Sequence, residues 1–500
     1  MPLWMVYMVL SERSPLTGKP PARTNIFITA WGFRVARFDE QGNARAFQRW
    51  SGRQVRGSTF FFCVCEDDRI NNNLEGGCPT DISNGDGDNN PKSLPSNRHK
   101  TMKDIKYFFQ AAFLLSIAAV GFCSCKDSIT IEYESPVADE PSLSNVTLKV
   151  YLENSGSMDG YMCPGSELKD AVYDYLGRLK PEFGETELYY INSQIISRPN
   201  DLKSFIATLD PDSFKKAGGN RSDTDMGDLI EKVVKESSDN SVTIFISDCI
   251  LALNNASPKD FFVNRQIAIR TAITKAMKEN NNLSVEVVQL ESKFDGTYYY
   301  GDGRKAKLNG EKRPYYMWII GSNEMLAEMN KKAPIEEIKH GVENWVSFSK
   351  QQAIPFETTN KYGNPPKKIF ATKNAYEILV KADMASILKP QESLLIADNY
   401  STSKAISISS IDRKEGKIVL SVSINKTIKS REETIKYIDA NKLPGWVEVA
   451  NNDSCDDIMT ALDQTTGIKY LIGGVADAYK NVETLGEITL KLKINYGRIF

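Results

Sequence analysis

Oxygen-bearing side chains stand at the ends of two predicted strands. The first strand, residues 146–152, alternates apolar and polar positions and runs directly into Glu153, Ser155 and Ser157. The second is a short apolar strand, residues 242–247, and it ends at Asp248. Carboxylate and hydroxyl oxygens can ligate a hard cation, and a serine can act as a nucleophile in hydrolysis. Because ligands of open α/β sheets bind at the carboxyl ends of strands, these four side chains are the first candidates for a binding site.

Strands and helices alternate around these positions. Ser166 is a plausible N-cap for an amphipathic helix, and a later helix opens at Thr224. Asn309-Gly310 is a tight-turn signal that would link strands at 284–290 and 315–320. Helices near 325–332 and 334–349 would close this part of the chain. The pattern predicts an α/β domain over residues 145–350, built on a doubly wound, mostly parallel sheet of Rossmann type.

The candidate residues resemble the metal-binding motif of von Willebrand factor A domains. Glu153, Ser155 and Ser157 have the spacing of that family's Asp-x-Ser-x-Ser motif, and Thr224 and Asp248 match its later threonine and aspartate in order and context. The resemblance covers residues 145–330 and implies that these five residues hold Mg²⁺, or alternatively Mn²⁺ or Ca²⁺. It also implies that the metal captures an acidic group of a partner.

Glu153 stands where the family has aspartate. The added methylene displaces the carboxylate by about one bond length, which a near-octahedral Mg²⁺ shell would register. Three readings follow: the glutamate reaches the ion, the site prefers another ion, or the site binds none. Asp159, Asp223 and Asp225 are expected near the same site, where their carboxylates could orient the metal ligands. Asp228 is better explained as an acidic residue favoured at a helix N-terminus.

The part of the chain that follows residue 125 contains few cysteines and histidines. Cys163, Cys249 and Cys455 are its cysteines and His340 is its histidine, which argues against a cysteine-rich zinc module and a histidine-based triad. In the sheet order that the resemblance implies, Cys163 and Cys249 lie on neighbouring strands. They could form a disulfide in an oxidising periplasm or remain buried free thiols.

A change in basic-residue usage divides the chain at Met102. Residues 1–101 hold 10 Arg and 3 Lys, whereas residues 102–500 hold 10 Arg and 39 Lys. Residues 102–124 have the charged, apolar and small-residue parts of a secretory signal. A signal must be N-terminal to be read, so we interpret residues 1–101 as a spurious upstream extension.

The end of this signal resembles the lipobox of bacterial lipoproteins. Ser124 supplies the small residue before Cys125, which makes Cys125 the predicted lipidation site rather than Cys123. The resemblance, together with Lys126 and Asp127, implies a lipoprotein of Bacteroides type, anchored to the outer membrane on its periplasmic or cell-surface face. Residues 125–144 would then be a tether.

The C-terminal part, residues 368–500, shows short alternating apolar runs interrupted by two helical stretches. These runs predict a β-sandwich-like module after a linker near residues 361–368. No catalytic motif is evident in it.

Composition and motifs together leave three functions open. With 62 Lys+Arg against 64 Asp+Glu, the chain has no overall positive charge that would attract nucleic acid. The first function is a lipid-anchored binding protein whose metal captures a carboxylate on a protein or glycan. The second is a metal-dependent hydrolase of phosphoesters or esters with Ser155 or Ser157 as nucleophile, and the third is a metal-free envelope scaffold. The motif places no histidine or lysine base, so binding is favoured over turnover.

Overall fold

The computed structural model describes residues 127–132, 141–222, 225–253, 257–360, 365–366, 368–439, 441–454 and 457–496, with the backbone of five earlier strands. The chain divides into two compact units, residues 1–101 and residues 102–500. The predicted lipidation site Cys125 and the signal segment lie outside the described residues, as does Cys455.

The first unit contains one antiparallel sheet in the order β4-β3-β2-β1-β5. Its strands are β1 (Val6–Leu10), β2 (Thr24–Ile28), β3 (Val35–Phe38), β4 (Ala44–Phe47) and β5 (Phe62–Val64). These strands lie in residues 1–101, the segment interpreted from the sequence as a spurious upstream extension.

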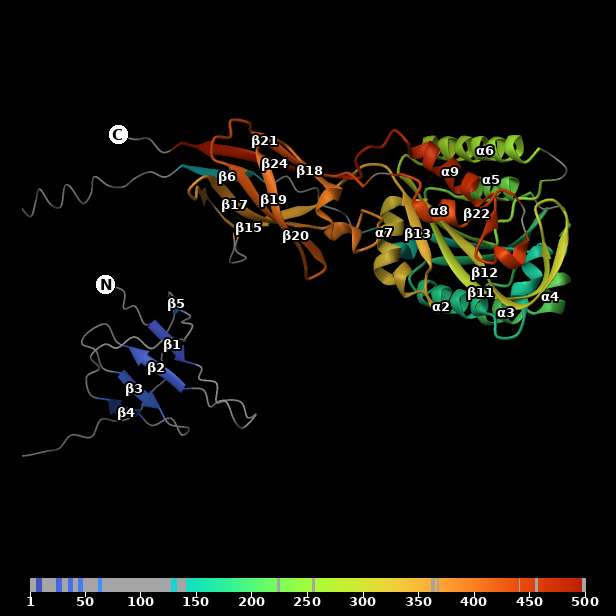
Figure 1. The fold of residues 1–500 in the computed structure, drawn as a ribbon, viewed down its shortest axis with the longest axis horizontal. Helices are drawn as coiled ribbons and strands as arrows, with labels where there is room; N and C mark the ends of the chain where they lie inside the picture. The colour runs from blue at the N-terminus through green and yellow to red at the C-terminus, as the bar shows by residue number, and fades with distance from the viewer. Residues whose placement is uncertain are drawn as a thin grey trace, which may run out of the picture. The chain divides into compact units, whose positions relative to one another are not determined.

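The centre of the second unit is a seven-stranded mixed sheet in the order β13-β11-β12-β10-β7-β8-β9 (Figure 1). Its strands are β7 (Thr147–Glu153), β8 (Glu185–Ile191), β9 (Ile195–Arg198), β10 (Ser241–Ser247), β11 (Leu283–Tyr299), β12 (Lys305–Ser322) and β13 (Asn344–Phe348). Only the β10-β7-β8 pairings are parallel, and every other pairing is antiparallel. The prediction of a doubly wound, mostly parallel sheet was therefore wrong.

The long hairpin β11/β12 is the main cause of this difference. β12 inserts between β10 and β11 and pairs antiparallel with both, so on this side of β10 the sheet continues through antiparallel strands. The hairpin turns at residues 300–304, where Gly303 has φ 86°. Asn309-Gly310 was predicted as this turn, but Gly310, with φ 99°, instead sits at a register shift opposite Phe294 and Asp295. A glycine with positive φ suits a β-bulge as well as a turn.

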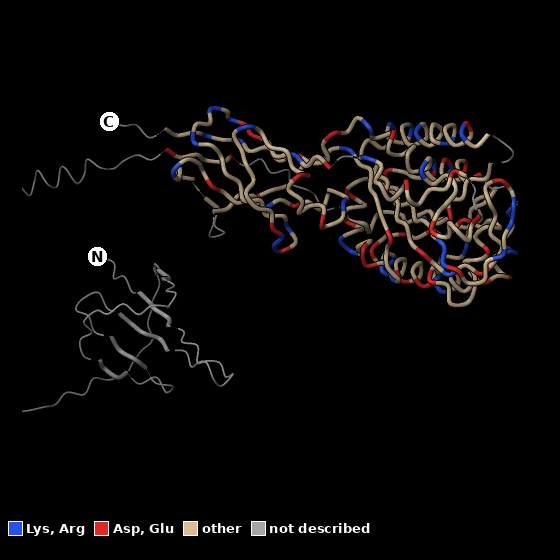
Figure 2. Tube along the Cα trace, in the orientation of Figure 1, with Lys and Arg blue, Asp and Glu red and all other residues tan. Residues whose placement is uncertain are grey.

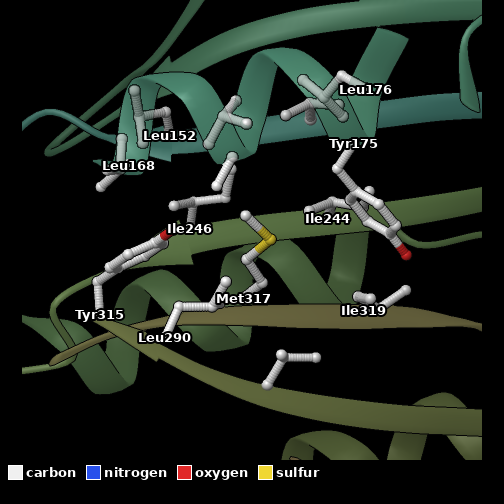
Figure 3. Packing of buried hydrophobic residues seen from close by; sticks show 14 of the residues in the cluster. Leu152, Leu168, Tyr175, Leu176, Ile244, Ile246, Leu290, Tyr315, Met317 and Ile319 are labelled. Atoms are coloured by element: carbon white, nitrogen blue, oxygen red, sulfur yellow. The ribbon is translucent and has the colours of Figure 1, made fainter. Parts of the chain in front are cut away.

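Helices cover both faces of this sheet (Figure 1). Residues of α2, α3, α4 and α7 belong to the core on one face, and residues of α5, α6, α8 and α9 belong to the core on the other. The helices are α2 (Glu167–Leu179), α3 (Leu202–Ala207), α4 (Pro211–Lys215), α5 (Met226–Glu236), α6 (Pro258–Glu279), α7 (Asn323–Lys332), α8 (Gly445–Val449) and α9 (Ile468–Tyr479). Figure 3 shows the first core, in which Leu168 and Leu176 of α2 face Ile246, Leu290 and Met317 of the strands.

The predicted helix at 334–349 is a strand and a short turn in the structure. Residues 335–337 form a 3₁₀ turn, His340 and Gly341 both have positive φ, and β13 then pairs with β11. Two consecutive left-handed residues end any helix, because they break its repeating hydrogen bonds. His340 Nε2 lies 3.3 Å from Asp170 Oδ2 on the surface.

A second module contains two sheets that share one core (Figure 1). The first has the order β16-β6-β24-β21-β18, with β14 paired to β24, and the second has the order β15-β17-β20-β19. Its strands are β6 (Ser128–Glu132), β14 (Gln352–Ala353), β15 (Phe356–Thr359), β16 (Ile369–Phe370), β17 (Ala375–Ala382), β18 (Tyr400–Thr402), β19 (Ile406–Lys414), β20 (Lys417–Asn425), β21 (Glu432–Tyr437) and β24 (Gly486–Asn495). Residues 128–132, which we had assigned to a tether, form strand β6 of this module.

Residues 445–479 do not belong to this second core. The segment contains α8, α9 and the paired strands β22 (Asn451–Asn452) and β23 (Thr465–Thr466), and it packs on the mixed sheet. Gly474 allows α9 to approach α6 closely, because a Cβ there would lie 2.7 Å from the Gln266 carbonyl. The helical stretches predicted as insertions of the β module therefore complete the α/β part.

Candidate functional site

The predicted site residues of β7 and β10 meet because these strands are parallel neighbours. Ile246 pairs with Leu152, so Glu153, Ser247 and Asp248 leave the same edge of the sheet side by side. Glu153 and Asp248 are both 2% exposed. The Ser247 hydroxyl donates to Glu153 Oε2 over 2.5 Å. Two carboxylates are thus held together at the carboxyl end of the parallel strands.

The two serines of the predicted motif lie in the loop that follows β7. Ser155 Oγ and Ser157 Oγ are 2.9 Å apart, and Ser157 begins a 3₁₀ turn, Ser157–Met162. Gly160 in this turn lies against the hairpin, since a Cβ there would lie 2.4 Å from the Phe294 ring. The hairpin β11/β12 therefore sets the position of the loop that carries the serines.

Burial is the largest influence on the pKa values of the carboxylate pair. Burial raises the pKa of Glu153, the charge of Asp248 raises it further, and hydrogen bonds from Ser247 and Ser155 oppose the rise. Burial also raises the pKa of Asp248, against hydrogen bonds from Ser157 and the Ile250 amide and the charge of Arg313. Asp248 Oδ2 is buried without a hydrogen-bond partner. Such an oxygen is costly unless a proton or a cation satisfies it.

The backbone is strained immediately after Asp248. Cys249 has φ 55°, a left-handed conformation that is rare for a residue other than glycine. Its amide donates to Ser247 Oγ over 2.8 Å, and the Trp318 indole lies 3.3 Å from its sulfur. Strain of this kind costs on the order of 1–3 kcal/mol and clusters at functional sites. The strained residue directly follows Asp248, the carboxylate whose pKa a hydrogen bond from Ser157 lowers.

Thr224, the fifth predicted ligand, and Asp223 lie outside the described residues. The other rim acids have structural partners. Asp225 caps α5 by accepting from the Asp228 amide, and Arg265 bridges Asp225 and Asp228. These contacts account for both acids as elements of the helix start.

Arg221 is a site residue that lies outside the sequence motif. Its guanidinium forms an ion pair with Asp159 and donates to the Ser155 carbonyl over 2.9 Å and to Asn154 Oδ1 over 3.1 Å. Its own carbonyl accepts from the Gly156 amide over 3.2 Å. Arg221 therefore ties the serine loop to the segment that leads to Thr224. No local pattern marks this arginine.

Arg313 is the second residue that the sequence did not reveal. It is 1% exposed and lies 4.8 Å over the Tyr298 ring, and its guanidinium donates to the carbonyls of Ala461 and Leu462. The charge of Arg313 lowers the pKa of Asp248. The buried Arg313 guanidinium therefore acts electrostatically on the carboxylate pair and is hydrogen-bonded to the C-terminal segment that packs on the mixed sheet.

Cys163 and Cys249 are both buried free thiols, so the alternative of a disulfide is not realised. The Cys163 sulfur lies 3.8 Å from the Lys293 carbonyl, whereas Cys249 contacts Trp318.

The donor set fits a hard cation rather than zinc. Among the described residues, no group of three or more His, Cys, Asp and Glu side chains could hold a metal ion. A site here would therefore combine the two carboxylates with the serine hydroxyls and water, the all-oxygen shell that suits Mg²⁺. The buried Asp248 Oδ2, which lacks a partner, is consistent with such a ligand.

Comparisons with protein-family models, with characterised proteins and with solved structures find no significant match for this chain. Among the described residues, no helix is both long and apolar enough to cross a membrane.

Proposed function

We propose that the protein is a binding protein that holds a divalent cation between Glu153, Ser155, Ser157 and Asp248 and uses it to capture a carboxylate. The site is of von Willebrand factor A type in its ligand pattern, carried on a mixed sheet. The observation that carries the proposal is the buried Asp248 Oδ2 with no hydrogen-bond partner, beside a second buried carboxylate and two hydroxyls. Thr224 is proposed as a further ligand.

The charges of the site favour an acidic ligand. Burial favours a proton on this carboxylate pair, and a bound divalent cation would replace that proton and leave both carboxylates ionised, with the buried Arg313 offsetting one of the two negative charges. A divalent cation would then make the site net positive, and its ligand shell would include neutral hydroxyls and exchangeable water. A carboxylate of the partner would neutralise this net positive charge and would replace one water in the ligand shell. No histidine or lysine appears among the contacts described for the serine hydroxyls, so the arrangement favours binding over hydrolysis.

The proposed setting is the cell envelope. Export and lipidation at Cys125 rest on the signal and lipobox pattern of residues 102–126. Such an anchor would hold the site at the membrane surface, where a carboxylate on a protein or glycan is the expected partner.

The proposal is tested by calorimetric titration of Mg²⁺, Mn²⁺ and Ca²⁺ into the purified protein. We expect at least one ion to bind, and the double variant Ser155→Ala, Ser157→Ala to weaken that binding by about 10–100-fold, since both hydroxyls are proposed ligands. The double variant Ser409→Ala, Ser410→Ala, at exposed positions of the β module, removes the same atoms elsewhere and should bind as the wild type does.

Absence of heat for all three ions, with circular dichroism showing an intact fold, would contradict the proposal. A metal-free scaffold would then be the better account. Equal affinities for the two double variants would contradict the assignment of the serines.

A further inference from the structure

The hairpin β11/β12 extends beyond its neighbours in the sheet and reaches the candidate site. β13 pairs with β11 only as far as Gln289, and β10 pairs with β12 only from Tyr316 onward. The outer part of the hairpin therefore pairs only with itself, and it packs on the serine loop. A Cβ on Gly156 would lie 3.5 Å from the Tyr299 hydroxyl, and one on Gly296 would lie 2.7 Å from the Gly160 Cα.

Lys305 is an exposed cation at the start of β12, and its charge is available to a ligand. Its ammonium lies 5.0 Å from the centre of the Tyr299 ring, and the residue is exposed. Two neighbouring cations are already paired, Arg304 with Asp302 over 2.6 Å and Lys307 with Asp295 over 3.2 Å. In the described part of the chain, no carboxylate forms an ion pair with Lys305. A single tyrosine ring thus separates an available ammonium from the loop that carries Ser155 and Ser157.

We propose that Lys305, supported by Tyr299, is a second contact for the captured partner, and that this partner is an extended acidic polypeptide with carboxylates two residues apart. This inference rests on the proposed function, because the first carboxylate goes to the cation and the second to Lys305. In an extended chain, residues i and i+2 project to the same side about 7 Å apart, so two such carboxylates can face the same surface of the protein. The described chain carries both signs of charge interspersed along its length (Figure 2), so a local cation rather than a global field must select the partner.

The experiment compares two labelled synthetic peptides by fluorescence anisotropy at saturating Mg²⁺. One peptide is Gly-Ser-Asp-Ser-Asp-Ser-Gly and the other is Gly-Ser-Asp-Ser-Asn-Ser-Gly, so that they differ in one carboxylate. We expect the two-acid peptide to bind about fivefold more tightly, the ratio that one exposed ion pair supports. In Lys305→Gln this ratio should fall to about one, whereas Lys307→Gln, which removes a charge already offset by Asp295, should retain it.

Each result decides between specific accounts. If Mg²⁺ binds but the wild type holds both peptides equally, the second contact is wrong and the proposed function stands. Equal loss in Lys305→Gln and Lys307→Gln would show general electrostatic attraction and overturn the role of Lys305. Tighter Mg²⁺-dependent binding of a labelled oligogalacturonate than of either peptide would replace the polypeptide by an acidic glycan. If neither Mg²⁺ nor Mn²⁺ nor Ca²⁺ binds, the proposed function and this inference both fail.

Discussion

Glu286→Gln is expected to raise the free energy of unfolding by roughly 3 kcal/mol at pH 7 and to leave it almost unchanged near pH 4.5. Glu286 lies on β11 with no exposed surface, and burial raises its pKa to about 8. Its Oε1 accepts from Asn330 Nδ2 over 2.9 Å, while its Oε2 and Asn330 Oδ1 are buried without partners. A glutamine keeps the shape, stays neutral and can donate to that amide oxygen.

The sign follows from where the proton is held. The folded carboxyl keeps its proton up to about pH 8, whereas an unfolded glutamate releases it near pH 4.5. The contribution of Glu286 to stability is therefore complete below pH 4.5 and is lost as the pH rises toward 8. The slope is about −1.4 kcal/mol per pH unit across that window, because each unit of differential proton binding carries that free energy.

Urea denaturation at pH 4.5, 6, 7 and 8.5 measures this slope. Glu377→Gln serves as the control, because Glu377 is an exposed strand residue of the β module and the same atoms change. Parallel stability curves for the wild type and Glu286→Gln would show that Glu286 is ionised in the folded protein and would refute the prediction.

Arg313→Met is expected to lower the free energy of unfolding by about 3 kcal/mol, since buried carbonyls lose a charged donor. The wild-type guanidinium serves the carbonyls of Ala461 and Leu462 and stacks on Tyr298, and methionine can fill the space but donates no hydrogen bond. The change also removes the positive charge that acts on Asp248. Cation binding should therefore tighten while stability falls.

A loss of stability together with a gain in cation affinity would distinguish an electrostatic role of Arg313 from a general loss of structure. Arg304→Met is the matched control, because Arg304 also stacks on a tyrosine of the hairpin, 4.5 Å over Tyr300, but its side chain is 57% exposed. We expect a loss below about 1 kcal/mol for it. Urea denaturation gives the stability change and calorimetry gives the cation affinity. Weaker cation binding in folded Arg313→Met would mean that the arginine supports the site by geometry rather than by charge.

Much of the candidate site could be predicted from local sequence. The alternation of residues 146–152 and the apolar run at 242–247 place Glu153 and Asp248 at strand ends, and the structure puts both strands there. Parallel pairing of these strands then brings Glu153, Asp248 and the two serines to one edge. Thr224 stays a prediction, because it lies outside the described residues.

The fold around the site was less accessible to the same reasoning. An apolar run such as 315–320 indicates a buried strand, but it does not indicate which strand is its neighbour or whether the pairing is parallel. The Asn309-Gly310 pair was misread for a related reason, since positive φ serves a bulge and a turn equally. Within the predicted helix at 334–349, residues 344–348 form β13, which pairs with β11 at the edge of the sheet.

The sequence by itself determined which residues form strands at the site and which oxygen-bearing side chains follow them, because both depend on neighbours within a few positions. Only the tertiary structure decided that β12 lies between β10 and β11, that residues 445–479 return to the α/β part, and that Arg313 and Glu286 are buried. The physical reason is that strand pairing and the burial of a charge depend on contacts between segments far apart in the chain. No local pattern encodes the energies of such contacts.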